Sequence, residues 1–212
     1  MTRAGKGGKV NLNPVIQRAR ALLLSPRTEW PVIAAEPATV ADLYRRYILI
    51  VAAIPPVCGF IKSCLLGYGW QGFQVFRLGI AAGISQAVVG YAVALAVVYV
   101  VALIIDALAP TFAAQQNRVQ ALKVAAYSYT ASWVAGIGLL LPLGLSVVIA
   151  LAGAGYSIYL LYLGLPATMK VSADRAGGYT AVTMVVAIIL GWLTALIVGG
   201  VIPGPSLVGA YG

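Results

Sequence analysis

Five apolar runs, each about as long as a bilayer is thick, occupy most of this chain. Continuous apolar stretches of about 20 residues are typical of transmembrane helices. The runs lack the alternation of polar and apolar residues that strands of membrane β-barrels show. In lipid, the other structure that pairs all of its backbone N–H and C=O groups is the α-helix. The sequence therefore predicts an all-α membrane protein with five transmembrane helices, at residues 47–66, 80–108, 121–141, 143–165 and 179–202.

The distribution of positive charge gives these spans a direction. The chain has a formal net charge of +9, and all of its 14 lysines and arginines except Lys62 and Arg77 lie on or near one side of the predicted spans. Because loops rich in lysine and arginine stay in the cytoplasm, we expect a cytoplasmic N-terminus and, after five crossings, a C-terminus on the opposite side. The basic charge flanks membrane spans, so it does not indicate a nucleic-acid partner.

The segment before the first span has its own organisation. Residues 1–11 are short, basic and glycine-rich, which is typical of disorder, and residues 203–212 form a tail on the far side. Residues 12–46 are expected to hold an amphipathic helix and a linker, with Arg18 and Arg20 opposite the apolar face. We expect this helix to lie in the cytoplasmic interface and contact anionic headgroups, with Arg45 and Arg46 at the same level. Ordinary packing against the bundle is the alternative.

Two local motifs predict features of the first span. Thr39 and Asp42 have the spacing of a capping box, which predicts that a helix starts there. Pro55 and Pro56 lie in the middle of the span, where their missing backbone donors predict a kink. Such a kink serves either as a hinge or to shape the packing of the helix.

The residues that enzymes use for chemistry are scarce in this chain. It has no histidine, which excludes His-based zinc sites and Ser-His-Asp triads, and it has no phosphate-binding loop or nucleophile-elbow motif. We therefore predict a non-enzyme without a cofactor. Asp106 is the one acid within a predicted span, and Lys123 begins the next span at a similar depth. A salt bridge between them and a polar opening to a cavity are the two interpretations.

Tyrosines gather near the expected cytoplasmic boundary of the membrane. An aromatic belt at the interface accounts for them without a further role. The alternative is a polar lining inside the bundle, formed by residues 127–130 (YSYT) with Tyr156, Tyr159 and Tyr162. The candidate interior residues among them are Tyr127, Tyr129, Tyr156 and Tyr159.

Several segments of the sequence resemble one known family. They are LLSP at residues 23–26 with Glu29 and Trp30, QALK at 120–123 followed by YSY at 127–129, Trp133 and Pro142, YSIYLLYLGLP at 156–166, and GYT at 178–180. These segments resemble the bacterial branch of the Yip family, the Ypt/Rab-interacting membrane proteins, over about residues 22–202. The resemblance implies five transmembrane helices in the bacterial inner membrane, a cytoplasmic N-terminus and an outward C-terminus.

The sequence departs from the eukaryotic branch of that family at one motif. Eukaryotic members carry Asp-Leu-Tyr-Gly-Pro before the first span and are linked to Rab-type GTPases and vesicle traffic. Here Asp42, Leu43 and Tyr44 are followed by two arginines. The resemblance therefore does not extend the GTPase role to this chain.

Two functions are consistent with the sequence. The first is a non-enzymatic membrane protein that organises lipids or protein partners, as the basic interfacial helix indicates. Gly79 and Gly83 form a GxxxG motif, which indicates close helix packing within the chain or, as the alternative, pairing with a second copy of it in a homo-oligomer. The second function is a small permease or lipid-handling transporter with a cavity between its helices, as the two prolines, Asp106 and the tyrosines indicate.

Overall fold

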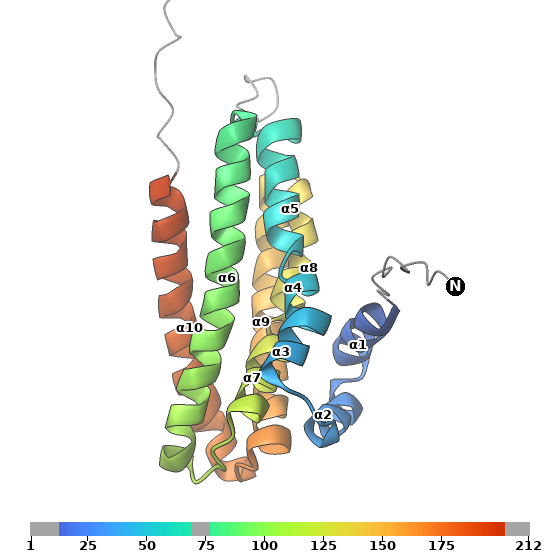
Figure 1. Ribbon diagram of the computed structural model, residues 1–212, viewed down its shortest axis with the longest axis vertical. Helices are drawn as coiled ribbons and strands as arrows, with labels where there is room; N and C mark the ends of the chain where they lie inside the picture. Colours follow the sequence, from blue (N-terminus) through green and yellow to red (C-terminus); the bar gives the residue numbers. More distant parts are fainter. Residues whose placement is uncertain (1–12, 69–76, 202–212) are drawn as a thin grey trace, which may run out of the picture.

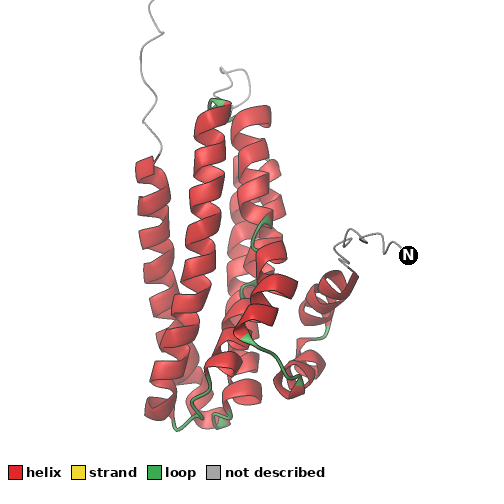
Figure 2. Ribbon diagram, viewed as in Figure 1, coloured by secondary structure: helices red, strands yellow, loops and turns green. Residues whose placement is uncertain are grey.

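The computed structural model describes residues 13–68 and 77–201, and this part of the chain is helical nearly throughout (Figures 1 and 2). The helices are α1 (Asn13–Leu24), α2 (Pro26–Ala35), α3 (Val40–Leu43), α4 (Leu49–Val51), α5 (Ile54–Phe60), α6 (Ile80–Leu108), α7 (Arg118–Ser128), α8 (Thr130–Ala135), α9 (Leu143–Met169) and α10 (Ala173–Val201). π-Helical turns η1 (Tyr44–Ile48) and η2 (Ile61–Leu66) and 3-10 turns η3 (Ala109–Phe112) and η4 (Gly136–Leu140) extend or join them. The two predicted tails lie outside the described residues.

Within the described residues, four helical stretches have the length and apolar composition to cross a membrane. They are Val40–Leu66, Ile80–Phe112, Leu143–Met169 and Ala173–Gly200. Their outward faces are apolar, as Leu151 on α9 and Trp192 on α10 show, whereas the outer face of a helix in a water-soluble protein is polar. This pattern indicates contact with lipid, and it confirms the predicted α-helical membrane protein for four of the five spans.

The third predicted span is the interior segment of the bundle. Residues 118–140 fold as α7, α8 and η4 in sequence, and the α-helix is interrupted at Tyr129. Every residue from 121 to 128 is buried, because α7 packs between α6 and α9 and also contacts α2. Each of its α-helical parts is shorter than a bilayer crossing at 1.5 Å per residue. The lengths of these α-helical parts therefore do not confirm that this segment is a fifth transmembrane helix.

The first span starts at the predicted capping box. The backbone N–H of Asp42 donates to Thr39 Oγ1 at 3.1 Å, and the backbone N–H of Thr39 donates to the Asp42 carboxylate at 3.3 Å. These two bonds satisfy backbone donors that have no partner within the helix. From there the chain continues through η1, α4 and α5 to η2.

The α-helix of the first span is interrupted close to its two prolines. The helix is interrupted at Ala52 and Ala53, directly before Pro55 and Pro56, which lie in the first turn of α5. A neighbouring helix supports the backbone here, because the Tyr91 hydroxyl on α6 donates to the carbonyl oxygen of Leu49 at 2.7 Å. Such support from outside the helix allows proline within a membrane span.

The GxxxG motif of α6 is used within the chain at one of its glycines. A Cβ atom at Gly83 would collide with Cys64 Sγ and would lie 3.2 Å from the Phe60 ring. The absence of a side chain at Gly83 therefore lets α6 approach the end of the first span closely. A Cβ atom at Gly79 would meet no other atom within 4 Å among the described residues.

Candidate functional site

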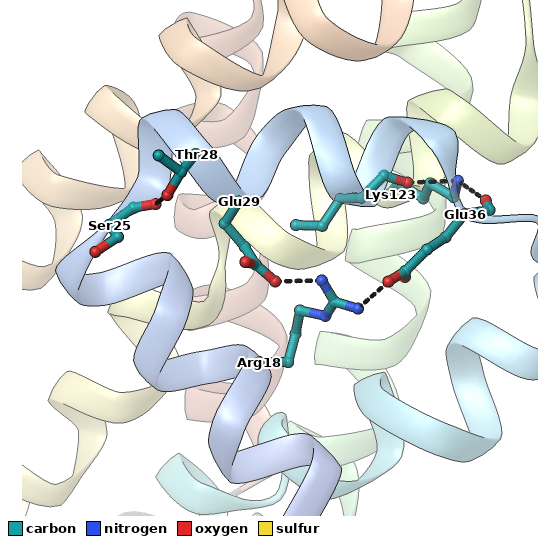
Figure 3. A network of polar contacts seen from close by, with 7 residues as sticks. Arg18, Ser25, Thr28, Glu29, Glu36 and Lys123 are labelled. Carbon is teal, nitrogen blue, oxygen red and sulfur yellow. Dashed lines mark hydrogen bonds and ion pairs between the residues drawn. The ribbon is translucent and has the colours of Figure 1, made fainter.

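Arg18 lies at the centre of a polar network that joins α1 to α2 (Figure 3). Its guanidinium donates to the carboxylates of Glu29 and Glu36, and its side chain is 20% exposed. Burial lowers the pKa of Arg18, but the hydrogen bond with Glu36 and the charges of Glu36 and Glu29 together raise it above its ordinary value. Two carboxylates hold this guanidinium within the protein. This corrects the assignment of Arg18 to a basic, membrane-facing surface.

Lys123 closes the C-terminal end of α2. Its Nζ atom donates to the carbonyl oxygens of Ile33 at 2.8 Å and Glu36 at 2.5 Å, and the residue is 2% exposed. Beside it, Gln120 Nε2 donates to the carbonyl oxygen of Ala34 at 2.9 Å. The last carbonyls of a helix lack partners within it, and positive charge is stabilised there by the helix dipole. The interior helix α7 thus supplies the cap of an N-terminal helix.

Trp30 anchors α2 in a notch on α9. A Cβ atom at Gly164 would lie 2.7 Å from the Trp30 ring, so the glycine is what makes room for the indole. The edge of the ring meets Tyr127, with the ring centroids 6.4 Å apart. Leu22 and Ile33 are fully buried beside it. On this face, α1 and α2 pack against the bundle. Such packing is the alternative that the sequence offered to a helix lying in the membrane interface.

The four predicted interior tyrosines fall into two places. Tyr127 and Tyr156 face the N-terminal helices: the Tyr156 hydroxyl donates to the carbonyl oxygen of Leu23 at 2.9 Å and so caps the end of α1. The Tyr159 ring lies 5.6 Å from that of Tyr156. Tyr129 lies in a different part of the bundle, where its ring stacks on Trp133.

Asp106 has a different partner from the one expected. Its carboxylate lies 3.7 Å from Nε of Arg118, whereas Lys123 donates to backbone carbonyls of α2. The expected salt bridge between Asp106 and Lys123 is therefore not formed. The turn η3 and the loop after it bring Arg118 back to the end of α6. Because the Arg118 side chain is well exposed, we expect this ion pair to contribute only about 0–1 kcal/mol.

A cavity of about 190 Å³ lies between α7, α9 and α10, beside α6. Its polar lining residues are Ser128, Tyr129, Ser132, Ser157 and Thr183. The hydroxyls of Ser132 and Ser157 bond to each other at 2.8 Å. Of the residues proposed from the sequence for an interior polar surface, Ser128 and Tyr129 line this cavity. A second hollow, of about 290 Å³, lies beside Pro55 and Pro56.

A model of the Yip1 domain matches residues 20–196 of the chain. The chain belongs to the Yip1 family. Its relatives include the inner membrane protein YohC of Escherichia coli K12 and that of E. coli O6:H1, each 28% identical over 170 residues, which cover 80% of this chain and 87% of the relative. No solved structure shows a significant match. The family predicted from the sequence is thus confirmed, and the chain is a multi-pass membrane protein of this family.

The Yip1 match covers the three features described above. It begins within α1 and ends within α10, so it includes the Trp30 notch, the Lys123 cap and the cavity. The segment that most resembles the Yip family, residues 156–166, carries both Tyr156 and Gly164. In the structure these two residues contact α1 and α2. In this Yip1 protein, that part of α9 is therefore a docking surface for the N-terminal helices.

Sequence reasoning missed several residues of these sites. Trp30 and Glu29 were noted within a family segment, but their partners lie on other helices and no local pattern identifies them. Ser128 belongs to the polar lining that the sequence offered as an alternative, but Thr183 was passed over as an isolated hydroxyl in an apolar span. Hydroxyl side chains on three separate spans were the one signal in the sequence for a shared polar site.

Proposed function

We propose that this Yip1-family protein is a non-enzymatic organiser of lipids or protein partners at the inner membrane. The inner membrane is where its E. coli relatives are named to reside. In this proposal residues 118–140 make the fifth crossing beside α9, and α1 and α2 lie on the cytoplasmic side. The positive-inside distribution of lysine and arginine supports that orientation.

One observation carries the proposal: the outer face of α1 combines apolar and basic groups. Ile16, Arg20 and Leu24 follow one another at four-residue spacing, so they share one side of the helix. Ile16 is 61% and Leu24 69% exposed, and Arg20 is exposed between them. Exposed apolar groups with a basic residue are typical of helices that lie on an anionic membrane surface.

Further exposed arginines extend this surface. Arg27 on α2 and Arg45 on η1 are exposed, and neither forms an ion pair among the described residues, as is also true of Arg20. Arg46 is exposed too, with a loose contact of 3.6 Å to Asp42. Because Arg18, Lys123 and Trp30 hold the inner faces of α1 and α2, these outer cations keep fixed positions relative to the bundle.

The experiment measures the anionic lipid that the full chain retains. The protein is reconstituted in nanodiscs of phosphatidylcholine and phosphatidylglycerol, extracted in mild detergent, and its bound lipids are counted by native mass spectrometry. Near a membrane surface each arginine contributes about 1 kcal/mol, so Arg20→Gln with Arg27→Gln is expected to lower phosphatidylglycerol retention by roughly five-fold per arginine.

Arg77→Gln is the charge-matched control for each single variant, Arg20→Gln and Arg27→Gln, because it removes one positive charge on the side of the membrane expected to be periplasmic. Its retention of phosphatidylglycerol is expected to equal that of the wild type. Equal retention by the double variant and the wild type would reject a lipid-binding surface on α1 and α2. Proteins that copurify with the wild type and are lost from the double variant would instead identify a protein partner for the same surface.

A lipid-handling role is the second candidate, and the cavity between α7, α9 and α10 favours it. Its test is the movement of fluorescent phospholipid between the leaflets of vesicles that contain the full chain. We expect a rate that rises with the amount of protein. A rate equal to that of protein-free vesicles contradicts this role.

A further inference from the structure

Two hydroxyls of the cavity between α7, α9 and α10 are buried without a partner. Ser128 is 5% and Thr183 is 1% exposed, both line the cavity, and neither hydroxyl oxygen has a hydrogen-bond partner within the described part of the chain. Leaving a buried hydroxyl unpaired is unfavourable, and the membrane interior offers no bulk water to replace the missing bond. The cavity is therefore suited to a molecule that brings a hydrogen-bonding group.

Other threonines on α10 show that the free hydroxyl of Thr183 is not a general property of this helix. Thr180 and Thr194 donate to the carbonyl oxygens of Ala176 and Leu190, one turn before each, at 2.8 and 2.7 Å. This local bond is the common solution for threonine in a membrane helix. Thr183 sits between these two residues in the sequence and lacks such a bond.

The rest of the lining determines what kind of molecule fits. Alanines on three helices leave the space open, namely Ala125, Ala154 and Ala187, and no charged residue in the described part of the chain lines it. Its outer side is formed by Ile158 and Ile188, which are both exposed on faces of α9 and α10 that meet lipid. A volume of about 190 Å³ is larger than the roughly 150 Å³ cavity that holds a benzene molecule. An occupant would thus be uncharged, largely apolar and drawn from the bilayer.

The position of the hydroxyls along the helices places them below the headgroups. Thr183 follows Arg175, which is exposed near the start of α10, by eight residues, or about 12 Å of helix. The guanidinium of Arg175 belongs at headgroup level, because a charge within the hydrocarbon region is unfavourable. Headgroup phosphates therefore do not reach Ser128 and Thr183, whereas an oxygen carried on an acyl chain does.

We propose that this cavity binds one acyl lipid, with an uncharged oxygen on the lipid hydrogen-bonded to Ser128 and Thr183 and the chain leaving between α9 and α10. The proposal deepens the lipid-handling candidate by naming its ligand. Binding needs no movement between leaflets, so the site can be found even where the transport test fails.

Photo-crosslinking with a pair of probes tests the site in the full chain. Nanodiscs of phosphatidylethanolamine and phosphatidylglycerol receive either a diazirine-bearing long-chain methyl ester or a diazirine-bearing alkane of the same length. Labelled peptides are mapped by mass spectrometry. We expect the ester to label the peptides around residues 154–161 and 183–188 several-fold more than the alkane does.

Variants separate the hydroxyls from the shape of the cavity. Ser128→Ala with Thr183→Val keeps the side-chain volumes nearly constant and is expected to remove the preference for the ester. The control pair Thr180→Val with Thr194→Val removes hydroxyls that bond to their own helix. This pair is expected to keep the preference for the ester. Ala187→Leu fills the space and should lower labelling by both probes.

Two results overturn the proposal. One is equal labelling by ester and alkane in the wild type, which is expected if water alone occupies the cavity. The other is an ester preference that survives Ser128→Ala with Thr183→Val, provided that the thermal unfolding midpoint of this variant is not below that of the wild type. That proviso is itself expected, since the variant removes two unpaired hydroxyls. If the double variant unfolds at a lower temperature than the wild type, the single variants Ser128→Ala and Thr183→Val are compared instead. An ester preference that survives in both of them overturns the proposal.

Discussion

Lys123 is a single cation that joins two parts of the molecule. Its ammonium group donates to backbone carbonyls at the C-terminal end of α2, and no acid among the described residues forms an ion pair with it. Lys123→Met removes both hydrogen bonds and leaves the carbonyl oxygens of Ile33 and Glu36 without this donor. We expect the free energy of unfolding to fall by about 2–4 kcal/mol in detergent, measured by denaturant titration.

Lys170 provides the control for this substitution. Its Nζ atom donates to the carbonyl oxygen of Ala167 at 2.9 Å at the end of α9, but the residue is exposed. Water can replace that bond, so Lys170→Met is expected to change the free energy of unfolding by no more than about 0.5 kcal/mol. Equal losses for the two variants would show that burial of the Lys123 cap is unimportant.

Gly164 tests the notch on α9 with a single methyl group. In Gly164→Ala the new Cβ would lie within 2.7 Å of the Trp30 ring, so the indole must leave its site. We expect a loss of about 1–3 kcal/mol in the free energy of unfolding and faster proteolysis of the segment between α2 and α3. Gly155→Ala, on the same helix with nothing within 4 Å of its Cβ, should be neutral or stabilising. Normal proteolysis of Gly164→Ala would contradict this account of the notch.

At the scale of elements, the break in the first span depends on support from α6. Tyr91→Phe removes the hydroxyl that donates to the carbonyl oxygen of Leu49. Hydrogen bonds between membrane helices contribute about 0.6 kcal/mol on average and up to about 1.7 kcal/mol. We expect a loss within this range in the free energy of unfolding, together with faster amide exchange around residues 49–53.

Tyr99→Phe is the control, because Tyr99 lies on the same helix and its hydroxyl makes no hydrogen bond among those found in the described residues. It should leave both the free energy of unfolding and the exchange rates unchanged. If Tyr91→Phe behaves in the same way, the break is held by side-chain packing alone, such as the contact of Pro55 with Gly136.

The elements were predictable where their signals are local. The length of each apolar run, the capping box at Thr39 and the break at Pro55 follow from short stretches of sequence. The interruption of the interior segment at Tyr129 was not predictable, because a helix buried on all sides has no polar face that marks its phase. The partners of Arg18 and Lys123 were missed for a related reason. They lie 11, 18, 87 and 90 residues away, and their choice depends on how α2 sits on the bundle.

At the scale of the whole molecule, the number of crossings fixes the side on which each end lies. With five crossings, alkaline phosphatase fused after Gly212 is expected to be active in a bacterial host, and green fluorescent protein fused there should stay dark. The same fluorescent protein fused before Met1 should be bright. A bright C-terminal fusion with inactive phosphatase would indicate an even number of crossings, and residues 118–140 would then not span the membrane.

The cap on α2 also sets an order for biosynthesis. Ile33 leaves the ribosome 90 residues before Lys123, and Leu23 leaves it 133 residues before Tyr156. At about 5–20 residues per second, α1 and α2 exist for several seconds before the helices that hold them are made. The first helices to be synthesised are thus among the last to reach their final positions. During that interval Leu22, Trp30 and Ile33 have no bundle to pack against, so the nascent chain must shelter them in the membrane surface or in a chaperone.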